Sequence, residues 1–341
     1  MHRRQFLKGF GLCAAAVAAR ARVASPELPN GPTQIELPRL ANLPVSVRSG
    51  LVVSASEVLP KGFKASSNRE PISATRVKER LGAALSKLLP GGLSALVGPK
   101  DVVAIKVNAL AAPHLAPRPE LLLALAELLT TCGVKPGNII IWDRTTREIV
   151  SCGLRKQTDA SDIRVYGTDA LRGGGYGNSI ESFGSVGSLV SLVLSRYATV
   201  LISVGVLKDH DLAGVSGAMK NLFGAIHNPN RYHDYGCDPF VAEVFGLPSI
   251  RRRYSLSIID ATLGQAEGGP AYASQWVWPE GRILVGVDPV AVDTVCRDLI
   301  GKRRSHLGLP SLAEASREPK WLATGERLGL GLTGNVKMLE A

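Results

Sequence analysis

The chain has 341 residues, of which 45% are hydrophobic and 5% aromatic, and its formal net charge is +11. This length suits a globular protein with a sizeable core, as two domains or one large α/β unit. Five positive charges, at Arg3, Arg4, Lys8, Arg20 and Arg22, precede the first acidic residue, which leaves +6 for the remainder. So modest a surplus, in basic runs without interleaved aromatic residues, argues against nucleic acid as a partner.

Residues 1–24 have the pattern of a twin-arginine signal peptide. Arg3 and Arg4 precede a weakly apolar stretch over residues 9–19, which is too short and too weak for a permanent membrane span. We therefore expect the twin-arginine translocase as a partner and the periplasm as the location. This pathway exports folded proteins, often because a cofactor is inserted before export. Residues 25–50, rich in proline and polar residues, are expected to be a tether, and residues 51–339 a single α/β domain.

Helical and strand patterns alternate along that domain. A helix is predicted over residues 74–89, and a strand at 101–107 is followed by a helix at 119–132 and a strand at 138–142. This order indicates a crossover between parallel strands. The later predicted elements are strands at 162–166, 198–204, 254–260 and 282–287, helices at 288–300 and 321–328, and a short strand near residue 336. We expect an α/β fold with a mostly parallel sheet and helices on both faces, in one or two lobes.

Polar residues gather most densely in the stretch 204–233. The buried strand predicted at 198–204 precedes Lys208 and His210, and a glycine-rich segment follows them. In α/β proteins the carboxyl ends of parallel strands form the usual ligand-binding edge. We therefore expect a catalytic site in which Lys208 and Lys220 supply positive charge and His210 carries protons near neutral pH.

A short helix is expected after the glycine-rich segment. Ser216 can cap a helix over residues 217–223, and the free N–H groups at its start would favour a small anionic ligand or cofactor. The candidate cofactor-binding residues are Lys106, Asn108, Gly214, Ser216, Gly217, Asn221 and Glu267. For Asn108 and Asn221 the alternative is hydrogen bonding to loop backbone, and for Glu267 it is plain solvent exposure.

Three histidines within this stretch are candidate metal ligands: His210, His227 and His233. Iron or nickel is the expected metal. No two cysteines lie at Cys-x-x-Cys spacing, which argues against an iron–sulfur cluster. Four cysteines follow the signal segment, and the sequence leaves their pairing open.

The motifs resemble those of a bacterial family known as domain of unknown function 362. They lie at residues 103–108, 206–210, 214–224, 258–260 with 267–270, and 286–293, and the resemblance spans residues 51–339. Members of the family are often described as iron–sulfur proteins because many carry an added ferredoxin-like cysteine segment. This chain has no such segment.

A second, local resemblance concerns the run from His210 to Lys220. It is similar to a segment of nickel-dependent lactate racemases, in which a lysine tethers a nickel pincer nucleotide. That resemblance implies a tethering role for Lys220 and a general acid–base role for His210. It also implies a metal ligand at His227 or His233, without deciding between them.

Three functions follow as hypotheses. The first is an exported, cofactor- or metal-dependent enzyme of the oxidoreductase type that acts on a small anionic substrate at residues 208–233. The second is a racemase or epimerase of the nickel-pincer type. The third is a periplasmic protein that binds an anionic ligand without catalysis, which explains the lysines but not the histidines.

Overall fold

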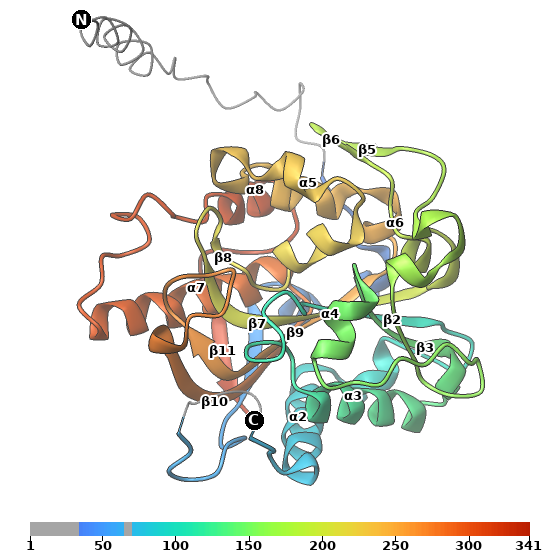
Figure 1. The fold of residues 1–341 in the computed structure, drawn as a ribbon, viewed down its shortest axis with the longest axis horizontal. Helices are drawn as coiled ribbons and strands as arrows, with labels where there is room; N and C mark the ends of the chain where they lie inside the picture. The colour runs from blue at the N-terminus through green and yellow to red at the C-terminus, as the bar shows by residue number, and fades with distance from the viewer. Residues whose placement is uncertain (1–33, 65–69) are drawn as a thin grey trace, which may run out of the picture. The chain divides into compact units, whose positions relative to one another are not determined.

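A nine-stranded sheet lies at the centre of the fold (Figure 1). The computed structural model describes residues 34–64 and 70–341, so the predicted signal peptide and the start of the predicted tether lie outside the described residues. The strands are β1 (Leu51–Ala55), β2 (Val103–Val107), β3 (Ile139–Asp143), β4 (Arg164–Gly167), β7 (Val200–His210), β8 (Gly214–Val215), β9 (Tyr254–Gln265), β10 (Val277–Gly286) and β11 (Lys337–Glu340).

The sheet is mostly parallel, as predicted. Its order is β11-β1-β10-β9-β7-β2-β3-β4, with β8 paired to the end of β7. β10 is antiparallel to both of its neighbours, and β8 is antiparallel to β7, whereas the other pairings are parallel. The parallel neighbours β7, β2, β3 and β4 end at one edge of the sheet, which is where the sequence predicted a site.

Helices lie on both sides of the sheet (Figure 1). They are α1 (Val45–Arg48), α2 (Ala74–Leu88), α3 (Pro119–Thr131), α4 (Thr146–Ser151), α5 (Phe240–Gly246), α6 (Pro248–Arg251), α7 (Pro289–His306) and α8 (Trp321–Arg327). A two-stranded ribbon of β5 (Glu181–Phe183) and β6 (Val186–Ser188) lies apart from the main sheet. The described residues form one compact unit and not two lobes. No helix among them combines the length and the apolar character that crossing a membrane requires.

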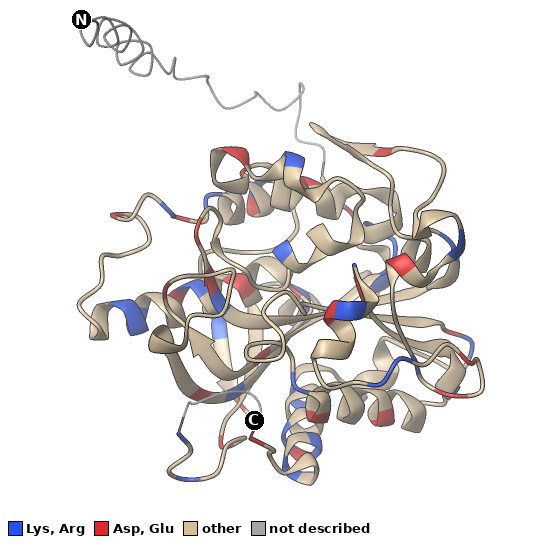
Figure 2. Ribbon diagram, in the orientation of Figure 1, with Lys and Arg blue, Asp and Glu red and all other residues tan. Residues whose placement is uncertain are grey.

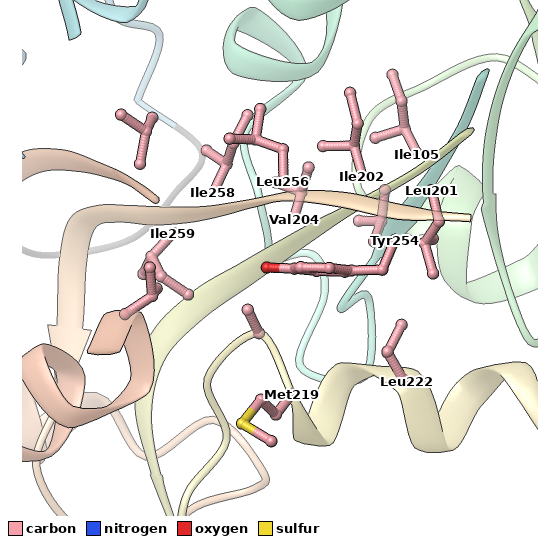
Figure 3. Packing of buried hydrophobic residues seen from close by; sticks show 14 of the residues in the cluster. Ile105, Leu201, Ile202, Val204, Met219, Leu222, Tyr254, Leu256, Ile258 and Ile259 are labelled. Atoms are coloured by element: carbon pink, nitrogen blue, oxygen red, sulfur yellow. The ribbon is translucent and has the colours of Figure 1, made fainter. Parts of the chain in front are cut away.

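The central strands are apolar and buried along their whole length. Every residue of β7 is buried, as is every residue of β2, which is the pattern of strands covered on both faces. Figure 3 shows Leu256 and Ile258 on one side of the sheet and Tyr254 on the other, toward Met219 and Leu222. Hydrophobic burial on both faces therefore holds the strand ends that carry the polar residues in fixed positions.

Residues 34–50 pack against the domain, although the sequence predicted a tether there. Ile35, Leu40 and Val47 are buried in the main core. The backbone N–H of Gly50 donates to the carboxylate of Asp288 at 2.8 Å. The same Asp288 caps α7 through the N–H of Ala291 at 2.8 Å. The folded domain thus begins before the predicted boundary at residue 51.

Positions of Lys and Arg are interspersed with those of Asp and Glu along the ribbon (Figure 2). The ion pairs with a fully buried partner lie close to the carboxyl end of the sheet. They are Lys106–Asp143, Asp209–Arg317 and Glu267–Arg304. The charges that matter for the site are therefore those inside the fold.

Candidate functional site

A cleft of about 390 Å³ opens where β2, β3 and β7 end. The predicted site residues that line it are Lys106, Asn108, Lys208, His210, Ser216, Lys220, Asn221 and His233. The predicted site residues outside its lining are Gly214, Gly217, His227 and Glu267. The structure therefore brings together residues that are more than a hundred positions apart in the chain.

The strand that leads into the site is longer than the pattern at 198–204 suggested. β7 extends to His210, and β8 folds back so that His210 pairs with Gly214. Because side chains alternate along a strand, Lys208 and His210 share the face that lines the cleft, whereas Asp209 points to the other face. Gly214 closes the turn with φ = +76°, and a Cβ atom there would lie 2.1 Å from a backbone oxygen of Arg317.

The predicted cap at Ser216 is wrong. The helix that follows is a 3₁₀ helix, Lys220–Ala225, without a side-chain cap, and Ser216 Oγ instead donates to the carbonyl of Asp209 at 3.2 Å. Ser216 therefore stabilises the hairpin and does not start the helix.

The backbone N–H groups that were expected to bind an anionic ligand instead donate to a carboxylate of the protein itself. A buried carboxylate of α7, Asp293, accepts the N–H groups of Ala218 at 2.7 Å and Met219 at 2.8 Å. Burial raises the pKa of Asp293 to about 7, against the lowering effect of these two hydrogen bonds. At Gly217 (φ = +42°) a Cβ atom would lie 2.3 Å from the Asp293 carboxylate, so the close approach requires glycine.

Lys106 is a structural cation within the cleft wall. Its Nζ donates to Asp143 Oδ1 at 2.6 Å, to the carbonyl of Val107 at 2.7 Å and to Asn221 Oδ1 at 2.9 Å, which occupies its three hydrogens. Asn221 Nδ2 in turn donates to the Lys106 carbonyl at 2.9 Å. Gly224 packs so closely on this group that a Cβ atom would lie 2.6 Å from Lys106 Nζ. Asn221 thus fits the alternative of backbone hydrogen bonding, and its polar atoms are committed.

Lys208 is a buried cation without a carboxylate partner among the described residues. Its side chain donates to the carbonyl of Pro270 at 3.0 Å, and it forms no ion pair there. Burial lowers the pKa of Lys208 to about 8, an effect that the nearby Lys220 reinforces and that Asp143 and Asp209 oppose. Lys208 therefore carries a buried charge that no carboxylate of the described residues contacts.

Lys220 and His233 form a close amine–imidazole pair. Lys220 Nζ lies 3.0 Å from His233 Nε2 and 3.9 Å from the centre of the Phe223 ring. His233 Nδ1 lies 3.0 Å from the carbonyl oxygen of Pro229, which only accepts, so the ring hydrogen is on Nδ1 and the Nε2 lone pair faces Lys220. Burial lowers the pKa of Lys220 to about 8, and burial and the Lys220 charge also lower the pKa of His233.

His210 is a neutral hydrogen-bond donor rather than a group that titrates near neutral pH. Its Nδ1 accepts the N–H groups of Leu212 and Ala213, both at 3.2 Å, and the carboxylate of the exposed Asp211 lies 3.0 Å from the same nitrogen. The two N–H groups leave the ring hydrogen on Nε2. Burial and the charge of Lys220 lower the pKa of His210 to about 2. This geometry favours Lys220 over His210 as the proton carrier of the cleft.

The three histidines are not gathered as a metal site would require. His227 is exposed and contacts Tyr176 edge-on at 5.1 Å between ring centres, outside the cleft. His210 and His233 stack at 5.8 Å, and one nitrogen of His210 and both nitrogens of His233 are already bound to the protein. In the described part of the chain no three His, Cys, Asp or Glu side chains form a possible metal site. The residues present do not fit the expected iron or nickel centre.

Glu267 lies behind β7, where it neutralises two arginines. Its carboxylate is bound by Arg304 and Arg317, and these hydrogen bonds lower the pKa of Glu267. It is not among the residues that line the cleft. The four cysteines within the described residues, Cys132, Cys152, Cys237 and Cys296, are free thiols.

Some residues that line the cleft were not among the site residues predicted from the sequence. Asp143 and Arg144 follow a predicted strand, so the rule that selected Lys106 and Asn108 could have selected them too. Phe223 gave no such signal, because an aromatic residue in a short apolar helix is expected to be core. Its role as the surface beneath Lys220 depends on the 3₁₀ geometry of the turn.

None of the curated proteins matches the chain. One family model, described as domain of unknown function (DUF362), matches residues 103–298, which is more than half of the chain. This range contains every residue that lines the cleft. It also contains the parallel strands β2, β3, β4, β7 and β9 that position those residues. The match and the motifs agree, and the chain belongs to the DUF362 family.

Proposed function

We propose that this protein is an exported enzyme that binds a small anionic substrate in the cleft and transfers a proton through Lys220 and His233. The observation that carries the proposal is the pair of buried lysine amines, Lys208 and Lys220, which have no carboxylate partner among the described residues. The reaction class that fits best is proton transfer at carbon, as in an epimerase or isomerase.

An anion is the ligand that buried amines of this kind require. A buried ammonium group is costly unless an opposite charge or several acceptors offset its lost hydration. Lys208 has one carbonyl acceptor, and Lys220 has an imidazole, the Cys237 thiol and an aromatic face. A substrate carboxylate or phosphate would supply the missing charge, with the Nε2–H of His210 as a neutral donor beside it.

Proton transfer is the chemistry that the amines support most directly. A pKa of about 8 lets Lys220 exist in both protonation states near neutral pH, which suits a general acid or base. The Nε2 lone pair of His233 at 3.0 Å can receive the amine proton and return it. Lys220 would then act on the substrate, and His233 would set the protonation state of Lys220.

Deuterium exchange tests the proposed chemistry without knowledge of the substrate. The purified protein is incubated in D₂O with small 2-hydroxy and 2-oxo carboxylates, and NMR follows deuterium entering C2 of the hydroxy acids and C3 of the oxo acids. We expect exchange with at least one class, its loss in Lys220→Met, and no change in the matched surface variant Lys302→Met. Binding of inorganic phosphate without exchange into any class would instead support the alternative, a periplasmic anion-binding protein.

Export by the twin-arginine translocase is part of the same proposal. Replacing Arg3 and Arg4 by lysine together should retain the protein in the cytoplasm, as followed by cell fractionation. A protein that reaches the periplasm equally well with both lysines would contradict this route.

A further inference from the structure

The two lysines of the cleft differ in their suitability for covalent chemistry. Lys208 is fully buried and donates to the Pro270 carbonyl, with no base beside it in the described structure. Lys220 is 7% exposed, faces the Nε2 lone pair of His233 and lies over the Phe223 ring. A nucleophilic amine needs access to the ligand and a group that takes its proton, and Lys220 has both.

We propose that Lys220 forms a Schiff base with the carbonyl carbon of a small oxo acid, whose anionic group is bound by Lys208 and His210. This inference rests on the proposed function, since it assigns the substrate class of the same cleft. It names 2-oxo acids and short aldehyde acids as the compounds that the site takes.

The step balances with the groups present. The unprotonated Nζ of Lys220 attacks the carbonyl carbon, and the first of the two amine hydrogens passes through His233 Nε2 to the carbonyl oxygen to give a neutral carbinolamine. The second amine hydrogen passes through His233 Nε2 to the hydroxyl, and the carbon–oxygen bond breaks to release water. No oxidant or reductant takes part, and the product is an imine that gains a further proton to become a cationic iminium.

The burial of Lys220 favours the unprotonated amine that starts this step, and the Phe223 ring favours its cationic product. The ring face at 3.9 Å stabilises a positive nitrogen, whether ammonium or iminium. The lowered pKa of Lys220 makes its unprotonated fraction at neutral pH larger than that of an exposed lysine by on the order of a hundredfold. The iminium in turn acidifies the hydrogens on the neighbouring carbon, which connects the covalent step to the proton transfer proposed above.

Reductive trapping tests the inference on the full chain. The protein is treated with pyruvate or glyoxylate and sodium cyanoborohydride, and peptide mass spectrometry locates the secondary amine that results. We expect the adduct on Lys220 to form at least about tenfold faster than any adduct on the exposed Lys302. Lys220→Arg, which keeps the charge and cannot form an imine, should carry no adduct in the cleft. Lys302→Arg is the matched control and should be trapped on Lys220 as the wild type is.

Competition by inorganic phosphate separates this inference from the proposed function. Phosphate should suppress trapping on Lys220, because it occupies the anion position at Lys208, and it should leave trapping on Lys302 unchanged. Phosphate binding, measured by calorimetry, with no adduct on Lys220 would overturn the Schiff base and leave the anion cleft intact. Equal labelling of Lys220 and Lys302 would overturn it as well. Trapping that proceeds unchanged under saturating phosphate would overturn the shared anion position.

Discussion

The two faces of β7 carry buried charge in opposite ways. Behind the strand, Asp209 accepts from Arg317 at 3.2 Å and from the Gly269 N–H at 2.8 Å, and Glu267 completes the neutralisation of Arg317. On the cleft face Lys208, the very next residue toward the N-terminus, has one carbonyl acceptor. On one face of β7 the charge of Asp209 is thus neutralised by protein partners, whereas on the other face the charge of Lys208 has no carboxylate partner among the described residues.

The difference teaches how to tell a structural charge from a functional one. Burial alone does not discriminate, because both Lys208 and Asp209 are fully buried. What discriminates is whether the partners present offset the lost hydration. Lys106 confirms the point from inside the cleft, since its three hydrogens are all bound by protein oxygens and it behaves as part of the scaffold.

The largest effect on function is expected from Lys220→Met. Removing the amine should lower proton exchange by about a thousandfold, within the range that general acid–base groups contribute. The unfolding free energy should not fall, because the variant also removes a buried charge. Exchange assays and urea denaturation of the same preparation, with Lys302→Met as control, distinguish the two quantities. Unfolding of Lys220→Met at lower urea than the wild type would place Lys220 with the structural charges.

Asp209→Ala should give the largest loss of stability. It removes the partner of Arg317 and leaves the Gly269 N–H without its acceptor, so we expect a loss of about 3 kcal/mol in the unfolding free energy. Urea denaturation measures it, and phosphate affinity of the folded protein should change little. A stable variant that has lost phosphate binding would reverse our assignment of the two faces.

Lys208→Met should stabilise the protein and weaken anion binding. At pH 7 we expect a gain of about 2 kcal/mol, because methionine removes a buried ammonium group of similar length. Phosphate affinity should fall about tenfold, in line with the loss of one charged hydrogen bond. Stability comparable to that of the wild type at every pH would mean that Lys208 is compensated by the fold.

The pH dependence of that gain has a definite sign. The pKa of Lys208 is about 8 in the folded state against 10.5 for the free side chain, so the folded protein binds fewer protons between these values. The wild type therefore gains stability as pH rises from 8 to 10.5, and the advantage of Lys208→Met shrinks across the same window. Urea denaturation at the two ends of the window measures the change, and an advantage that grows with pH would refute it.

Ser216→Ala should have the smallest effect. Its hydroxyl makes one hydrogen bond to a backbone carbonyl and caps no helix, so a loss of about 0.5 kcal/mol is expected. A lost helix cap would cost about 1 kcal/mol or more. Thermal and urea unfolding of the variant can separate these values, and the larger loss would speak for capping.

Reasoning from the sequence reached the sheet and most of the cleft lining for a simple reason. Apolar β-branched runs identify buried strands, and polar residues at their carboxyl ends meet at one edge when the strands are parallel. Lys106 on β2, Asn108 just after β2, and Lys208 and His210 on β7 therefore share a cleft. Their spacing of two residues puts each pair on one face.

The features that could not be predicted are hydrogen bonds and ion pairs between residues that lie far apart in the chain. Asp293 lies inside α7, and nothing near it in sequence indicates that its carboxylate binds the Ala218 and Met219 N–H groups. The commitment of Lys106 to Asp143 is hidden for the same reason. Local patterns identify a polar group at a strand end, but they do not say whether the fold has already bound it.

The hydrogen bonds from Ala218 and Met219 to Asp293 affect how the cleft binds its ligand. Because α7 anchors this turn through two short hydrogen bonds, the amine stands in place before any ligand arrives, and little ordering remains to be done on binding. A ligand of another size would not be accommodated, because this part of the cleft does not rearrange on binding. We therefore expect this protein to select its ligands by their size and by the distance between their carbonyl carbon and their anionic group.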